Sequence, residues 1–306
     1  MKTNSIFLYV INVILFFICH SVFATEKQPI KIVTTIPYLK TLVQEASCFS
    51  KKIETHSIIA VGRDPHSFFM TPQHRIALDK AQIVIAIGSG FEPWLDKMTK
   101  KAEQQWLSVT AGMPLAKIHK DEKHHHHDSE LLYDPHIWQS PELTKKAVQK
   151  IAAQLQIALP SEANNFAQCT EHYLSYLTKE VAHLKKMSEV LPPQKRVIAT
   201  NHDALGYFAA EFDFKIYSIL GLSDDAAPTA QQLKKIITAI KKENISAVFL
   251  ESTGNMRNIK TVSNEAGVKV GGVLYGDSLG GKNSDADTAP AMWRHNLITI
   301  INALKD

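Results

Sequence analysis

The chain has 306 residues, a formal net charge of +4 and 45% hydrophobic residues, a composition typical of a folded globular protein. A chain of this length is too long to fold around one ordinary hydrophobic core, which favours two domains. The charges are spread without a long basic block, which argues against a nucleic-acid partner.

The N-terminal segment has the pattern of a secretory signal peptide. Lys2 precedes an apolar run from residue 6 to residue 18, and small or modest residues stand at the −3 and −1 positions of a cut after Ala24. This run is too short to span the ~30 Å of hydrocarbon in a bilayer. We therefore predict that residues 1–24 are removed after Ala24 and that the mature protein is exported to the periplasm.

The three cysteines raise two separate questions. Cys19 follows the bulky Ile18, whereas a cysteine that receives a lipid normally follows a small residue, so we expect no lipid anchor. Cys48 and Cys169 remain after cleavage. In an oxidising compartment they could form a disulfide, or both could be buried thiols, and the sequence leaves these alternatives open.

The first half of the mature chain alternates strand-like and helix-like segments. A run of β-branched and small residues bounded by Gly88 predicts a buried strand at 83–87. Pro141 fits the first turn of a helix. The predicted strands are 30–35, 52–59 and 83–87, and the predicted helices are 37–46, 72–81 and 141–159.

A long helix is predicted from residue 162 to about residue 190. The segment has no Gly or Pro, its apolar residues recur near a 3.6 period, and Pro192 follows it. At ~1.5 Å per residue it would extend about 40 Å, which suits a rigid connection between two lobes.

The second half resumes the alternation, which predicts parallel sheets covered by helices. Its predicted strands are 196–200, 214–219, 247–250 and 268–274, and its predicted helices are 204–212, 230–242, 256–266 and 288–304. The predicted fold class is α/β, with two lobes that each contain a mostly parallel sheet flanked by helices, joined by one long rigid helix. The predicted boundaries are 25–160 for the N-terminal lobe, 161–190 for the linking helix and 191–306 for the C-terminal lobe.

Polar side chains that follow the predicted strands, or precede a helix, form a candidate metal site. They are His66, His136, His202 and Asp277. Ligands bind beyond the carboxyl ends of parallel strands, and three imidazoles with one carboxylate suit a divalent ion such as Zn²⁺. Spacing alone leaves structural roles open, because Asp277 could cap a loop and Asp203 could cap the helix that follows His202.

Neighbouring residues support ordered loops at these positions. Pro65 and Pro135 stiffen the backbone before His66 and His136, and Gly276 allows a tight turn before Asp277.

A second, more conspicuous group of histidines lies in a charged loop without apolar residues. It consists of His119 and the four consecutive residues His124, His125, His126 and His127. Such a loop is predicted to be flexible and to serve as an accessory, low-specificity metal site, or to be a solvated loop with incidental metal affinity.

Several motifs in order resemble the zinc/manganese substrate-binding proteins of ABC importers, the ZnuA/TroA-like (cluster A-I) family. The motifs span nearly all of the mature chain: Gly62 to Phe68, Ala81 to Trp94, Asp134 to Trp138, Thr200 to Phe208, Leu274 to Leu279 and Met292 to Ile298.

The resemblance implies two α/β lobes with a metal ion between them, bound by His66, His136, His202 and Asp277. Manganese-selective members tend to have Glu at the third position, so His202 favours Zn²⁺, with Mn²⁺ as the alternative. Asp134 is expected to orient a ring, and Trp138 to shield the site from water.

The resemblance also implies delivery to an integral-membrane permease with its cytoplasmic ATPase, and we expect a monomer. Four protein ligands favour binding over catalysis, so no enzyme activity is predicted. An exported zinc hydrolase is the alternative from another class, although the sequence has no HExxH motif.

Overall fold

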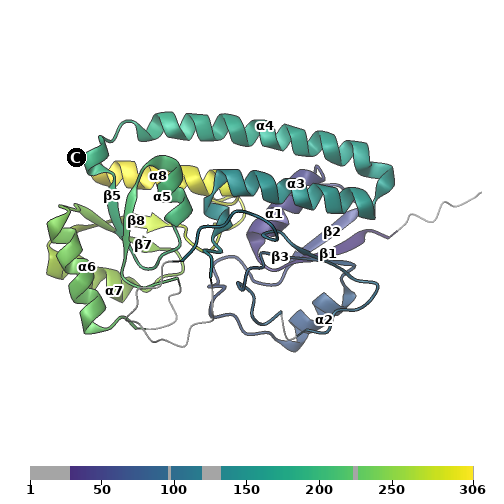
Figure 1. Cartoon of the computed structure of the whole chain (residues 1–306), viewed down its shortest axis with the longest axis horizontal. Helices are drawn as coiled ribbons and strands as arrows, with labels where there is room; N and C mark the ends of the chain where they lie inside the picture. Colours follow the sequence, from purple (N-terminus) through teal and green to yellow (C-terminus); the bar gives the residue numbers. More distant parts are fainter. Residues whose placement is uncertain (1–27, 96–97, 119–131, 223–226, 306) are drawn as a thin grey trace, which may run out of the picture.

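A computed structural model of the chain describes residues 28–95, 98–118, 132–222 and 227–305. The predicted signal peptide, residues 1–24, lies outside them. Two four-stranded sheets lie side by side under one long helix, α4 (Figure 1). Within the described part of the chain, no helix combines the length and the apolar character that crossing a membrane requires.

The N-terminal lobe is built on four parallel strands in the order β2-β1-β3-β4. The strands are β1 (Ile30–Thr34), β2 (Ile53–Ser57), β3 (Ile83–Ala86) and β4 (Gln105–Ser108). The helices are α1 (Pro37–Ala46), α2 (Pro72–Lys80) and α3 (Pro141–Ala158). Pro37 lies in the first turn of α1, and Leu39, Leu42 and Val43 are fully buried on one side of that helix.

The C-terminal lobe repeats this arrangement with the order β6-β5-β7-β8, again all parallel. Its strands are β5 (Val197–Thr200), β6 (Lys215–Ser218), β7 (Ala247–Glu251) and β8 (Lys269–Leu274). Its helices are α5 (Gly206–Phe212), α6 (Ala230–Lys242), α7 (Met256–Ala266) and α8 (Ala289–Leu304). The predicted fold class is confirmed.

Helix α4 (Ala163–Ser188) is the predicted connection between the lobes. It has 26 residues, so at ~1.5 Å per residue it is roughly 40 Å long. It packs against α1 and α3 on the N-terminal side and against α8 on the C-terminal side (Figure 1). The buried Glu180 of α4 accepts from Arg294 of α8 at 2.9 Å, which fixes this second contact. The lobe boundaries at residues 160 and 190 stay predictions.

Two local features differ from the sequence-based expectation. Strand β4 was not predicted, because Gln105–Ser108 is a short edge strand with no fully buried residue. Helix α5 begins at Gly206 rather than at Ala204. The backbone N–H of Asp203 donates to Gly221 at 2.8 Å, so the chain after β5 is held in a bend before the helix begins.

The disulfide alternative is the one found for Cys48 and Cys169. Cys48, just after α1, is bonded to Cys169 of α4. The bond closes a sequence separation of 121 residues and fastens the long helix to the N-terminal lobe.

Candidate metal centre

Four elements from both lobes bring the predicted ligands together. His66 lies on the loop after β2, and His136 directly precedes a 3-10 turn at Ile137–Gln139. His202 follows β5 and Asp277 follows β8. One potential ligand atom from each of the four lies within 4.8 Å of the others. The arrangement follows from parallel topology, because strand carboxyl ends meet at one edge of each sheet.

The three imidazoles converge on the carboxylate of Asp277. Its oxygens lie 2.9 Å from Nε2 of His202, 3.3 Å from Nε2 of His136 and 3.7 Å from Nε2 of His66. The Nε2 atoms of His66 and His136 are 3.4 Å apart. The same nitrogen of all three rings therefore faces one small volume, which is the geometry that binding of a single ion requires.

Burial is uneven across this cluster. The side chains of His136 and His202 are 0% exposed and that of Asp277 is 1% exposed, whereas that of His66 is 8% exposed. The most exposed of the four is His66, which lies on a loop. Solvent therefore reaches the cluster from the side of His66.

Carboxylates lie behind two of the rings. Asp134 Oδ1 accepts from the backbone N–H of His136 at 2.9 Å and lies 2.7 Å from its Nδ1. Glu251, at the end of β7, has one oxygen 2.9 Å from the backbone N of His202 and the other 2.9 Å from its Nδ1. A partner at Nδ1 turns the ring so that Nε2 faces the centre.

Asp134 was anticipated from the sequence, whereas Glu251 was not. The signal was present, because Glu251 directly follows the apolar run at 247–250. The criterion that selected His202 and Asp277, a polar residue after a predicted strand, also selects Glu251.

The charges in this buried cluster raise the pKa of two of its histidines and lower the pKa of its carboxylate. Burial opposes the charged ring of His136, but Asp134 and Asp277 outweigh it and raise the pKa of His136 to about 9. Burial likewise opposes a charged His202, yet Asp277 and Glu251 raise its pKa well above the usual value. Burial would raise the pKa of Asp277, but the charges of His202 and His66 hold it well below its ordinary range. The cluster therefore favours a positive charge at its centre.

Aromatic rings enclose the cluster on the N-terminal side. Trp138 is 1% exposed, and its ring centroid lies 5.2 Å from that of His136. Phe91, which was not singled out from the sequence, packs edge-on against His66, with ring centroids 5.4 Å apart, and lies tilted against Trp138 at 5.2 Å. The two rings pack together on one side of the site, and the shielding role of Trp138 stays a prediction.

Hydrogen bonds across the lobes hold the loop that precedes Asp277. Trp138 Nε1 donates to the carbonyl oxygen of Gly276 at 2.6 Å, and Gln139 Nε2 donates to the same oxygen at 2.7 Å. Gly276 lies in a bend before Asp277 and does not have a positive φ, so the backbone conformation alone does not require glycine here. A Cβ atom at this position would lie 2.1 Å from Glu251 Oε2, and the glycine therefore makes room for that carboxylate.

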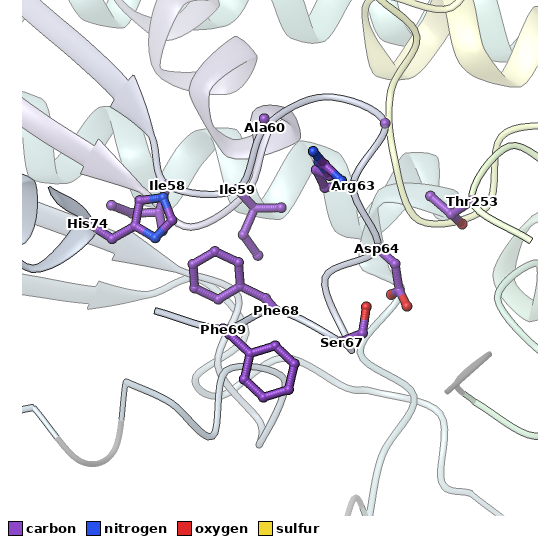
Figure 2. A pocket seen from close by; sticks show the side chains of 11 residues that line it. Ile58, Ile59, Ala60, Arg63, Asp64, Ser67, Phe68, Phe69, His74 and Thr253 are labelled. Atoms are coloured by element: carbon purple, nitrogen blue, oxygen red, sulfur yellow. The ribbon is translucent and has the colours of Figure 1, made fainter. Parts of the chain in front are cut away.

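The loop that contains His66 also borders an open groove of about 530 Å³. Figure 2 shows its lining, which includes Arg63, Asp64, Phe68 and Phe69 of this loop and Thr253 of the other lobe. The Phe69 side chain is 85% exposed. The loop with His66 is therefore less enclosed than the strand ends with His202 and Asp277.

The accessory histidines predicted from the sequence, His119 and His124 to His127, lie outside the described residues. Among the described residues, the cluster of His66, His136, His202 and Asp277 is the group whose geometry suits a metal ion.

Comparisons with known proteins agree with this architecture. The manganese-binding lipoprotein MntA of Bacillus subtilis is 31% identical over 269 residues, which cover 83% of this chain and 84% of that protein. The zinc-binding protein TroA of Treponema pallidum is 25% identical over 288 residues, covering 92% of this chain and 90% of that protein.

Solved structures match the fold over the same extent. The periplasmic zinc-binding protein TroA from Treponema pallidum superposes with a TM-score of 0.80 at 24% identity, covering 90% of this chain and 99% of that one. A Mn-bound periplasmic metal-binding protein from Candidatus Liberibacter asiaticus gives a TM-score of 0.77 at 23% identity, covering 90% of this chain and 99% of that one. The sequence profile of the family described as "Zinc-uptake complex component A periplasmic" matches residues 32–303, and the chain belongs to this family.

Proposed function

We propose that this protein captures a divalent metal ion, in the first place Zn²⁺, between its lobes and delivers it to an ABC importer. The observation that carries the proposal is the buried convergence of His66, His136, His202 and Asp277 within 4.8 Å. Four protein ligands complete a tetrahedral site, which suits capture of a transported ion.

The preference for zinc rests on the donor atoms. Three imidazole nitrogens and one carboxylate suit a borderline ion, whereas the harder Mn²⁺ is better served by more oxygen ligands. Manganese is the second candidate, because a relative named for manganese binding is 31% identical.

An exported zinc hydrolase is the less favoured function. Hydrolysis needs an open coordination position for water and a general base beside it. Two carboxylates beside the cluster, Asp134 and Glu251, are directed at ring nitrogens of His136 and His202. We therefore infer a binding protein without catalytic activity.

The proposed location is the periplasm, after removal of residues 1–24, with an integral-membrane permease and its ATPase as partners of the monomer. Several relatives, including MntA of Bacillus subtilis, are named lipoproteins. The bulky Ile18 before Cys19 supports an unlipidated form here. Mass spectrometry of the exported protein tests this point, because a diacylated cysteine at position 19 would contradict it.

Isothermal titration of the demetallated protein tests the metal site. We expect one Zn²⁺ per chain with a Kd far below about 1 µM, and weaker binding of Mn²⁺. His66→Ala should weaken zinc binding strongly, whereas His183→Ala, on an exposed position of α4, should not. Micromolar zinc binding, or an unchanged Kd in His66→Ala, would overturn the proposal.

A further inference from the structure

Glu251 is a fully buried carboxylate at the end of β7, and both of its oxygens face the same residue. It is 0% exposed. Oε1 accepts from the backbone N–H of His202, and Oε2 lies 2.9 Å from the ring Nδ1. Burying a carboxylate is costly unless hydrogen bonds or opposite charge compensate, so this placement needs a reason beyond packing.

We propose that Glu251 is a positioning residue that holds His202 in the tautomer and orientation required for metal binding. The inference rests on the proposed function. Glu251 contacts both the main chain and the ring of His202. A proton held at Nδ1 leaves the lone pair of Nε2 free to bind the ion.

Only a carboxylate can make both contacts from this position. The backbone N–H and the Nδ1–H of His202 are two donors, and they need two acceptor oxygens. A glutamine has the same shape but one acceptor and one donor group. It must therefore lose the backbone contact or place its NH₂ against Nδ1, which drives the ring proton to Nε2, the atom required by the metal.

The surroundings of Glu251 keep its carboxylate in place. Its backbone N–H donates to Asn201 Oδ1 at 2.9 Å, so the residue before His202 is bound to the same strand end. Gly276 borders the other side of this carboxylate. A Cβ atom at position 276 would lie 2.1 Å from Glu251 Oε2 and would collide with it. Because Gly276 has no side chain, it leaves the space that the carboxylate of Glu251 occupies.

Glu251→Gln is the direct test, measured by zinc titration and by NMR of histidines labelled with ¹⁵N. We expect one bound ion, an affinity about 10–100-fold weaker than that of the original protein, and a changed Nδ1–H resonance of His202 in the zinc form. The resonance is assigned by its loss in His202→Ala. An affinity within about twofold and an unchanged resonance would overturn the inference.

Glu180→Gln is the matched control, because it neutralises another buried glutamate, whose partner is Arg294 of α8. It should lower the free energy of unfolding without changing the zinc affinity. If it weakens zinc binding as much as Glu251→Gln does, loss of a buried charge explains both effects and the inference fails.

Gly276→Ala supplies a second variant that leaves every charge in place and tests the same contact if Glu251→Gln folds poorly. The added methyl group should displace the carboxylate, so Gly276→Ala alone should weaken zinc binding and change the Nδ1–H resonance of His202. Where Glu251→Gln folds, the double variant should bind zinc no more weakly than Glu251→Gln alone. If the affinity losses of the two single variants multiply in the double variant, the substitutions do not act through the same contact, which would contradict the inference. Failure of the proposed function is distinguishable, because the unaltered protein would then bind no zinc tightly.

Discussion

The indole N–H of Trp138 donates to the carbonyl oxygen of Gly276 at 2.6 Å, although the two residues are 138 positions apart. Trp138 lies just after His136, and Gly276 lies just before Asp277. One hydrogen bond thus connects the segments that supply a ligand from each lobe. Structural support for the site is therefore part of the interface between the lobes.

We expect Trp138→Phe to lower the free energy of unfolding by about 1–3 kcal/mol. It removes the donor from a buried contact, although Gln139 still donates to Gly276. Urea denaturation of the metal-free protein measures the loss. Trp106→Phe is the control, since its indole donates to Gln104 within the N-terminal lobe, and an equal loss there would argue against a special role for Trp138.

Zinc affinity should fall as the pH is lowered from 9 toward 6. In the metal-free protein the pKa of His136 is raised to about 9, so at neutral pH the ring holds a proton that the ion must displace. The apparent Kd should rise by up to about tenfold per pH unit for each proton released. Titration in buffers with different ionisation enthalpies counts these protons, and an affinity independent of pH would contradict the charged resting state.

The metal-free protein should also lose stability as the pH rises. The folded-state pKa of His136 exceeds the ordinary value of 6.5, so its contribution is complete below about 6.5 and is lost as the pH approaches 9. Urea unfolding at pH 6.5 and pH 9 measures the difference. His136→Ala is the control, since it should remove the part of this loss that His136 contributes, while the part from His202, whose pKa is also raised, remains.

Removing the disulfide should destabilise the fold without changing metal affinity. The bond between Cys48 and Cys169 closes a long loop, and loss of such a bond costs about 2–5 kcal/mol. The double variant Cys48→Ala and Cys169→Ala is compared with the parent by urea denaturation and zinc titration. A large loss of affinity would show that the long helix influences the site.

Deletion of residues 121–128 should separate the accessory histidines from the ligand cluster. We expect tight binding of one zinc ion to persist, while weaker additional binding disappears. Titration with excess zinc measures the stoichiometry, and loss of the tight site would refute this division of roles.

Much of the fold followed from the sequence because its signals are local. The strand and helix alternation, and the uninterrupted period of α4, need only neighbouring residues. Strand β4 was missed because Gln105–Ser108 is short and lies at the sheet edge. The cysteine pairing depends on how α1 packs against α4, which no local pattern specifies.

The candidate site divides in the same way. His202 and Asp277 could be proposed because they follow predicted strands, but their supporting contacts depend on distant residues. The need for glycine at position 276 is visible only when Glu251 is placed beside it. Phe91 likewise reaches His66 through a loop whose path the sequence did not indicate.

The uneven burial of the four ligands has a kinetic consequence. An arriving ion meets His66 first, since that side chain is 8% exposed and the other three are almost fully enclosed. We therefore expect changes at His66 to alter the association rate most, and changes behind His136 and His202 to alter the dissociation rate. Capture and retention would then be governed by different parts of one small site.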